Sequence, residues 1–462
     1  MSQFLQCIDL NISHGRYILA KLKIYKEQIL TNEIKEKASV KSFPRNFWVV
    51  ILMEFFERGS YYGVMSVLSV YLVLTVDKGG LGFTKESVGV IKSVITPLLY
   101  ILPILSGAIA DRFGYRKMLM FAFTVMSTGY FLTGLASSYA LVFLSLLLMV
   151  LGAGSFKPII SGTIARTTNE SNSTLGFGIF YWSINLGAFI FPLILVPFLK
   201  DISWSYIFFM AAIVTGSLFF VNLFVYREPE RPKSSKTIAE VFVGMFKVLR
   251  DWRFILMIVI YSGFWILYFQ MFDTVLWYLK DHMDMTPVNN FVNGIAGIFM
   301  TNPNWKFDAE HVTVINAGTI ILLQLVVSSI VKHTKALPTM IVGIAMGTLG
   351  MAILGISSQA WVFMAGIIIF SIGEMTAHPK FISYVGLIAP EDKKALYLGY
   401  SFLYGVIGSG IGGVLGAYSY VHFVDKLNNP SALWFMFSLI GVATIIGLLL
   451  YSKFVAPRPK TN

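Results

Sequence analysis

The sequence alternates between long apolar runs and short polar segments, and this alternation predicts the architecture. Each run holds about 20 residues or more, which lets an α-helix cross a hydrocarbon core about 30 Å thick. Six runs precede a polar connector and six follow it, at 47–75, 87–110, 117–135, 139–165, 176–198, 204–226, 254–278, 312–331, 337–356, 360–388, 395–420 and 432–452. The pattern predicts an all-α integral membrane protein with twelve transmembrane helices in two six-helix halves.

The polar segments divide the chain into five parts. We expect a cytoplasmic N-terminal leader at 1–45, a six-helix bundle at 46–226, a cytoplasmic connector at 227–253, a second six-helix bundle at 254–453 and a cytoplasmic tail at 454–462. Outside the bundles, the pattern favours short helical stretches near 26–37 and 240–248. The leader is not expected to be a signal peptide, because lysines interrupt its short apolar stretch.

Composition and charge agree with a membrane protein. Only 13% of the residues are charged, whereas a soluble domain has about 25%. With the N-terminus inside, 26 of the 36 Lys and Arg residues fall on the inner side and six on the outer side. The positive-inside rule therefore predicts a multi-pass protein with both termini in the cytoplasm. It also accounts for the net charge of +12 without a nucleic-acid partner. The absence of targeting signals fits the cell (inner) membrane.

Eight charged residues lie within the apolar spans, where an unpaired charge is costly and usually functional. They are Glu54, Glu57, Arg58, Lys92, Lys157, Asp273, Glu374 and Lys380. If the halves are repeats, the first span corresponds to the seventh and the fourth to the tenth. Most of the eight residues then fall on symmetry-related spans, so we expect them to share a central site.

The first span holds two carboxylates and one guanidinium on a single helical face. Glu54, Glu57, Arg58 and Tyr61 are spaced three and four residues apart. Because the carboxylates outnumber the arginine, one of them can take up a proton without leaving an unpaired buried charge. Lys157 of the fourth span lies at a similar depth, so a contact with Glu57 is allowed. The alternative is an ion pair that only holds helices together.

The tenth span places Glu374 and His378 one helical turn apart on the same face. Histidine titrates near neutral pH, so this pair is a candidate proton relay. The alternative is a histidine that only forms a structural hydrogen bond.

The segment GAIADRFGYRK at 107–117 closes the second span. Its charged residues Asp111, Arg112 and Arg116 are placed to latch the inner ends of neighbouring helices. This segment resembles the loop motif of the major facilitator superfamily, which implies the major facilitator fold.

Further motifs resemble the proton-dependent oligopeptide transporter family within that superfamily. They are Glu54-x-x-Glu57-Arg58 with Tyr61-Tyr62-Gly63, the segment FYWSINLG at 180–187, Phe156-Lys157-Pro158, Phe264-Trp265 with Gln270, and Gly373-Glu374 with Pro379. The resemblance extends over most of the chain. It implies a monomeric symporter that imports di- and tripeptides together with protons by alternating access, in a lipid bilayer and without a cofactor.

The resemblance also implies roles for individual residues. The residues expected to couple protons are Glu54, Glu57, Arg58 and Lys157. The residues expected to bind substrate are Glu374, Asn185, Tyr62, Tyr100, Trp265 and Lys157. A zwitterionic peptide needs a cation at one end and a carboxylate at the other, and Lys157 and Glu374 supply both.

Two departures from the family pattern leave the substrate open. Met65 and Phe269 stand where the family usually carries an arginine and a glutamate. Asp273 lies one turn past Phe269 and is a candidate replacement for the missing carboxylate. Nitrate, another small anion or a metabolite is therefore an alternative substrate on the same fold.

Lys85 and Asp281, at outer helix ends, form a candidate outer gate.

A membrane protein with no transport function is the remaining alternative. The chain has a single cysteine, Cys7, and shows neither a His and Cys cluster for a metal nor a Gly-rich phosphate loop. We therefore expect neither an enzyme nor a metal site.

Overall fold

The computed structural model describes residues 42–169, 172–229, 248–390 and 393–456. The helix predicted near 26–37 and all but the last residue of the stretch near 240–248 lie outside the described residues.

The first half contains six spans, each at one of the predicted apolar runs. They are α2 (Arg45–Val73), α3 (Lys85–Phe113), α4 (Tyr115–Leu135), α5 (Tyr139–Thr167), α6 (Ser173–Ile190) continued by the π-helical turn η3 (Phe191–Leu195) and α7 (Val196–Ile202), and α8 (Ser205–Phe224). Side chains fix two of the starts, because Thr84 and Ser138 accept hydrogen bonds from the first-turn N–H groups of α3 and α5.

The second half repeats this arrangement. Its spans are α10 (Trp252–Gln270) with α11 (Thr274–His282), α13 (Glu310–Val331), α14 (Ala336–Leu354), α15 (Ala360–Ile388), α16 (Lys394–Tyr400) with α17 (Leu403–Tyr420) and the π-helical η5 (Val421–Lys426), and α18 (Pro430–Phe454). The apolar pattern did not predict helix α12 (Thr286–Ala296), which lies between the first two spans of this half.

Eleven helical segments in the described chain are long and apolar enough to cross a membrane. Helix α2 is less apolar, because Glu54, Glu57 and Arg58 interrupt it. Its 29 residues nevertheless extend about 44 Å at 1.5 Å per residue. With α2 as the twelfth span, the predicted fold class is confirmed.

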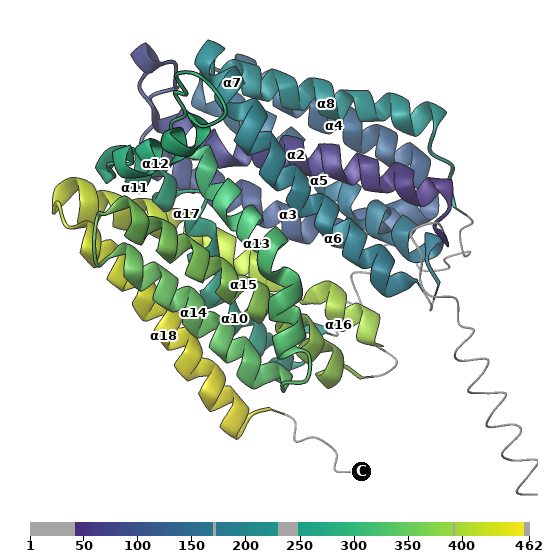
Figure 1. The fold of residues 1–462 in the computed structure, drawn as a ribbon. Helices are drawn as coiled ribbons and strands as arrows, with labels where there is room; N and C mark the ends of the chain where they lie inside the picture. Colours follow the sequence, from purple (N-terminus) through teal and green to yellow (C-terminus); the bar gives the residue numbers. More distant parts are fainter. Residues whose placement is uncertain (1–41, 170–171, 230–247, 391–392, 457–462) are drawn as a thin grey trace, which may run out of the picture.

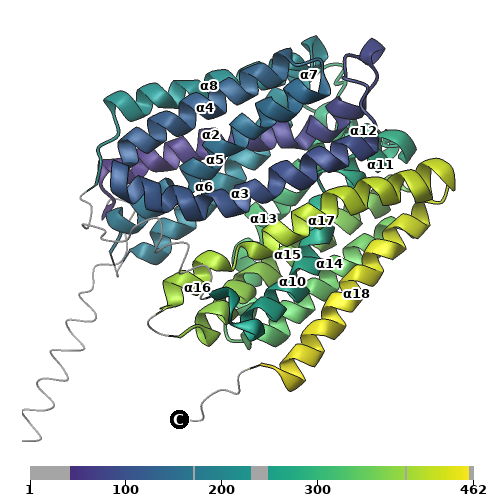
Figure 2. The ribbon, with the colours of Figure 1, turned by 180° about the vertical axis from the view of Figure 1, so that it is seen from behind.

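The two halves lie side by side, with α3 of the first half packed along α17 of the second (Figures 1 and 2). Glycines allow this close approach, since a Cβ atom on Gly89 would lie 2.7 Å from the carbonyl oxygen of Gly413. Small residues are typical where membrane helices pack this closely.

We name the two ends of the bundle by the helices that lie there. The α12 end carries α12, the start of α3 and η5, and the α16 end carries α16 and the start of α2 (Figures 1 and 2).

Candidate functional site

Two adjoining cavities lie between the halves, with volumes of about 430 and 60 Å³. Five residues line both of them, so the two cavities share a wall. These are Arg58, Tyr62, Leu99, Tyr100 and Lys157. Four of the five were predicted as site residues.

The larger cavity extends toward the α16 end. Its walls there include Ser161, one turn beyond Lys157 on α5, and Phe402, which is 43% exposed. Glu54 also lines this cavity. One wall of the larger cavity thus includes an exposed residue at the α16 end.

The charged cluster of α2 is buried beside this cavity. The guanidinium of Arg58 forms two hydrogen bonds with Glu57, from Nε to Oε2 and from Nη2 to Oε1, the second at 2.6 Å. Arg58 Nε also lies 3.8 Å from Glu54 Oε1. The other oxygen of Glu54, Oε2, is buried and has no hydrogen-bond partner among the described residues. The two carboxylates are thus in different states, since Glu57 is fully engaged and Glu54 is only partly paired.

A glycine contact holds this cluster in position. Gly59 follows Arg58 and lies against the ring of Phe191 in the π-helical turn η3, leaving no room for a Cβ atom. On the facing helix, a Cβ atom on Gly187 would lie 2.6 Å from the carbonyl oxygen of Phe55. Helices α2 and α6 therefore pack backbone to backbone at the depth of the charges.

Lys157 lines both cavities and has no carboxylate partner in the part of the chain that the structure describes. Its Nζ atom lies 5.6 Å from the centre of the Tyr100 ring. Within the described residues, Lys157 makes no ion pair of 4.0 Å or less. The contact allowed between Lys157 and Glu57 is absent in this conformation, because Arg58 already occupies both oxygens of Glu57.

Glu374 on α15 is held by a residue that the sequence did not reveal. Asn316 of α13 donates to Glu374 Oε2 at 3.0 Å and to the hydroxyl of Ser371 at 2.9 Å. Asn316 lies 58 positions earlier in the chain, and a single polar residue in an apolar span carries no strong signal.

His378 lies among aromatic rings. It is 5.4 Å from Trp265 and 5.6 Å from Tyr404, between ring centres. Its Nδ1 atom is buried without a hydrogen-bond partner. No hydrogen bond joins His378 to Glu374 in the described chain, so this conformation provides no direct contact for the predicted relay.

Three predicted substrate residues, Glu374, Trp265 and Asn185, do not line either cavity. Trp265 stacks on Tyr404 with ring centres 4.4 Å apart and meets the edge of Tyr100, so it supports the wall from behind. Asn185 on α6 donates its side-chain amide to the carbonyl of Tyr181 on its own helix at 2.9 Å.

The smaller cavity contains a buried ion pair between the halves. Lys92 of α3 lies 3.0 Å from Asp273, between α10 and α11. Ser69 of α2 also donates to Asp273. Met65 and Phe269, the two uncharged departures, line the same cavity. A buried charged pair is therefore present in the same cavity as Met65 and Phe269, but it is formed by Lys92 and Asp273.

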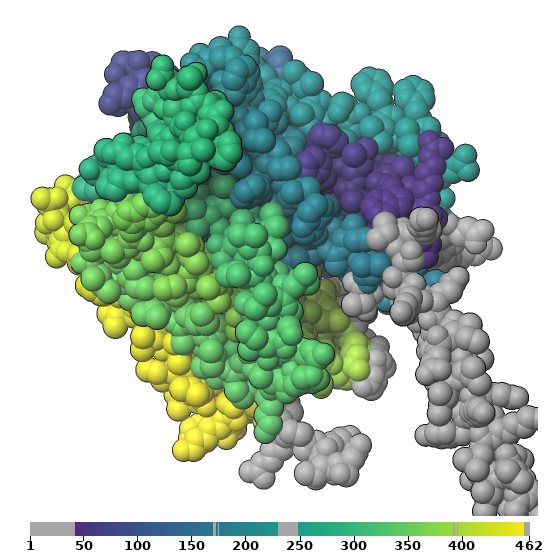
Figure 3. Space-filling model, viewed as in Figure 1, coloured from purple at the N-terminus to yellow at the C-terminus, as the bar shows by residue number. Residues whose placement is uncertain are grey.

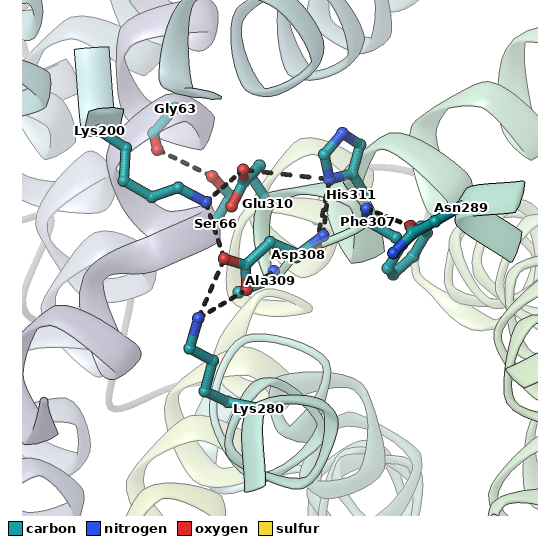
Figure 4. A network of polar contacts seen from close by, with 10 residues as sticks. All are labelled: Gly63, Ser66, Lys200, Lys280, Asn289, Phe307, Asp308, Ala309, Glu310 and His311. Atoms are coloured by element: carbon teal, nitrogen blue, oxygen red, sulfur yellow. Dashed lines mark hydrogen bonds and ion pairs between the residues drawn. The ribbon is translucent and has the colours of Figure 1, made fainter. Parts of the chain in front are cut away.

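A cluster of ion pairs joins the halves at the α12 end (Figure 4). Lys200 of α7 contacts Asp308 at 2.9 Å and Glu310 at 2.6 Å, and Lys280 of α11 contacts Asp308 at 3.1 Å. Burial opposes ionisation of Asp308, but Lys200 and Lys280 outweigh it and lower its pKa to about 2. No sequence pattern indicated this cluster, because its partners Lys200 and Asp308 are 108 positions apart.

The predicted pair at outer helix ends is present at the same end. Lys85 of α3 lies 3.1 Å from Asp281 and 2.9 Å from Asp425. Its ammonium also sits 4.2 Å above the ring of Tyr420. The α12 end is thus closed by two sets of ion pairs between the halves.

The predicted inner latch lies at the α16 end, within the first half. Asp111 accepts a hydrogen bond from Tyr115 at 3.1 Å and lies 3.6 Å from Arg166 of α5. Arg116 donates to the carbonyl of Leu223 on α8. Arg112 lies over Phe113 and makes no ion pair in the described residues. These contacts tie helices of one half together and do not join the two halves.

The chain resembles known transporters. It matches the family model described as Major Facilitator Superfamily over residues 48–305. It is 30% identical over 275 residues to a di-/tripeptide transporter of Lactococcus lactis subsp. lactis (strain IL1403), covering 56% of this chain and 51% of that protein. The match therefore spans about half the length of that relative.

Two further similarities cover more of the chain. It is 26% identical over 350 residues to the multidrug resistance protein MdtH of Shigella sonnei (strain Ss046), covering 75% of this chain and 80% of that protein. The crystal structure of a POT family transporter in complex with 5-aminolevulinic acid matches with a TM-score of 0.74 at 23% identity, covering 91% of this chain and 99% of that one. At that identity the likeness concerns the fold.

Proposed function

The chain belongs to the major facilitator superfamily, and we propose that it is a proton-coupled symporter that imports di- and tripeptides by alternating access. One observation carries this proposal. The cavity between the halves is lined by Lys157, which has no carboxylate partner among the described residues, and by Glu54, a buried carboxylate with one oxygen that no described residue hydrogen-bonds. The first can hold an anionic group and the second can take up a proton.

The cavity suits a small zwitterion in size and charge. Its volume of about 430 Å³ lies within the range of about 300–1,000 Å³ common for small-molecule sites. Lys157, from the first half, binds the peptide carboxylate. Glu374, from the second half, lies outside the lining of the cavity in this conformation and receives the peptide amine, in place of Asn316, when the halves close around the ligand. A ligand that touches both halves favours the conformation in which they close around it.

We assign proton uptake to Glu54 rather than to Glu57. Glu57 already accepts two hydrogen bonds from Arg58, so protonating it would break that pair. Glu54 has an oxygen without a partner and can be protonated at little cost to existing contacts. Its neutralisation weakens the attraction for Arg58 and leaves Lys157 freer to bind the substrate carboxylate.

The conformation corresponds to a state open to the cytoplasm. Lysine and arginine are concentrated in the segments at the α16 end, so this end, where the described chain begins at residue 42 and ends at residue 456, faces the cytoplasm. The ion pairs of the α12 end then close the outer side. The protein acts in the cell membrane as a monomer, since each chain contains a complete cavity between its own halves.

A second candidate keeps the mechanism and changes the cargo. Met65 and Phe269 make part of the smaller cavity apolar, so an anion or a metabolite without a free amine is an alternative to a peptide.

Reconstitution into liposomes distinguishes these candidates. The purified chain is given an imposed pH difference, acidic outside, with radiolabelled dialanine, trialanine or nitrate. We expect concentrative uptake of the peptides that collapses when a protonophore is added. Uptake of nitrate that the peptides do not inhibit would favour the second candidate. Absence of any proton-driven uptake in vesicles containing folded protein would contradict both.

A further inference from the structure

Helix α12 and the turn that follows it present an apolar surface outside the spans. Five large apolar side chains are exposed there: Phe291 by 56%, Ile295 by 47%, Ile298 by 75%, Phe299 by 84% and Met300 by 59%. Apolar surface left in water costs about 25 cal/mol for each Å². A cluster of this kind at the end of a membrane protein needs an apolar environment.

The same segment carries no charge. Between Asp284 and Lys306, the 21 residues at 285–305 include no Asp, Glu, Lys or Arg. A loop immersed in water usually contains charged residues, and a surface for a charged partner requires them. The segment therefore has the composition of a surface that faces lipid without electrostatic attraction.

Helix α12 buries Val288 against the chain and also turns polar residues inward. Its half-buried polar residues face the chain, since Asn293 forms two hydrogen bonds of 2.8 Å with the backbone of Trp305, and Asn289 accepts one of 2.7 Å from the N–H of Phe307. Phe291 and Ile295, also four residues apart, are exposed on another face. The apolar face is held outward by specific contacts.

This apolar face lies at the level where a span begins. Phe291 meets Trp361 edge to face with ring centres 5.4 Å apart. Trp361 is the second residue of span α15 and is 46% exposed. Tryptophan at the end of a span marks the boundary between headgroups and acyl chains. In Figure 3 the segment around α12 stands out at the surface of this end of the molecule.

We propose that α12 and the turn at 297–300 are an interfacial anchor, embedded in the headgroup and acyl boundary of the lipid leaflet at the α12 end. The bilayer that surrounds the spans reaches this depth, and an amphipathic helix with one apolar face binds such a boundary lengthwise. A zwitterionic lipid suffices, because the segment offers no charge to an anionic one. The inference depends only on the membrane location and is independent of the proposed substrate.

The anchor adjoins the ion pairs that join the halves. Asn289 accepts a hydrogen bond from the N–H of Phe307. Asp308, which follows Phe307, binds Lys200 of the first half (Figure 4). Glu310 follows two residues later and binds the same lysine. The anchor thus fixes the segment that carries Asp308 and Glu310 to the lipid boundary. Through this segment the second half binds the first.

Depth-dependent quenching tests the anchor directly. Cys7→Ser removes the only cysteine of the chain, and Phe299→Cys then receives an environment-sensitive fluorophore. Met300→Cys provides a second probe position, and Lys78→Cys, exposed on η2 outside the spans, is the matched control. Each labelled protein is placed in phosphatidylcholine liposomes with a lipid quencher near the headgroup, a lipid quencher at the chain end, or iodide in the water.

We expect the headgroup-proximal quencher to act on positions 299 and 300 at least about twofold more strongly than on position 78, and iodide to show the reverse preference. Equal iodide quenching at all three positions would overturn the proposal. So would stronger quenching from the chain end, which would mean deep insertion. Protection from iodide that disappears when the protein is diluted in lipid would identify a second copy as the occupant and would also overturn it.

Discussion

Lys92 of α3 and Asp273, at the junction of α10 and α11, form an ion pair between the halves, with Nζ and Oδ1 3.0 Å apart and each residue 6% exposed. Ser69 also donates to Asp273. The pair lines the smaller of the two cavities, on the side toward the ion pairs at the α12 end. It is placed so that the halves cannot separate at that end without breaking it.

Removing one member of this pair should open the α12 end. Lys92→Met leaves the Asp273 carboxylate buried without its cation, a loss of about 3–5 kcal/mol for comparable buried pairs. In the Cys7→Ser background, a cysteine probe introduced by Met65→Cys reports opening through its labelling by a membrane-impermeant maleimide. We expect labelling from the α12 side about tenfold faster than with Lys92 intact.

The double variant provides the control for this first prediction. Lys92→Met combined with Asp273→Leu removes both charges, and the labelling rate should return toward the starting value. If the double variant is labelled as fast as Lys92→Met alone, the effect comes from lost packing and the gating role of the pair is wrong.

Glu54→Gln should uncouple transport from the proton gradient. The amide keeps the shape of the side chain but cannot gain or lose a proton, so we expect uphill peptide uptake to fall at least about tenfold. Exchange of labelled for unlabelled peptide, which needs no net proton movement, should continue. Glu86→Gln, on the first turn of α3 away from the cavity, is the matched control and should leave both activities unchanged.

Glu57→Gln should behave differently from Glu54→Gln, and the comparison tests the assignment. Arg58 would lose its bidentate partner while remaining buried, so we expect less folded protein in addition to lost uphill uptake. Fluorescence-detected size exclusion measures the folded fraction. Normal folding of the Glu57 variant with lost coupling, alongside normal coupling of the Glu54 variant, would reverse the assignment of the proton site.

Lys157 should recognise the carboxylate of the cargo. With the wild-type chain, a dipeptide amidated at its C-terminus should compete with labelled dialanine at least about tenfold less well than the free acid, because a charged hydrogen bond is lost. Lys157→Gln should weaken binding of the free acid and abolish this preference. A preference that survives in the variant would move the carboxylate site elsewhere.

The spans could be predicted because each is a long apolar run, and the described helices agree with those runs. Helix α12 could not, since its 11 residues include Asn289, Asn293 and Gly294 and it is too short to form a run. The charges of α2 were recognisable because any charge in an apolar span is costly. Lys200 lies between the apolar runs 176–198 and 204–226, where lysines are ordinary, and only the fold brings it to Asp308.

Asp308 should stabilise the closed α12 end independently of pH across the range in which a proton gradient operates. Burial raises its pKa, but Lys200 and Lys280 outweigh burial and lower the pKa to about 2. A lowered pKa gives stabilisation that is complete above the ordinary value near 4 and is lost only as the pH falls toward about 2.

The variant Asp308→Asn tests this pH independence. The other titratable groups that face Asp308 are Glu310 and His311 of α13, and both remain in this variant. That variant should therefore speed maleimide labelling of the Met65→Cys probe by the same factor at about pH 7.5 and about pH 5.5. A factor that shrinks toward one at the lower pH would mean that Asp308 is protonated within the working range and that the two lysines do not hold it ionised.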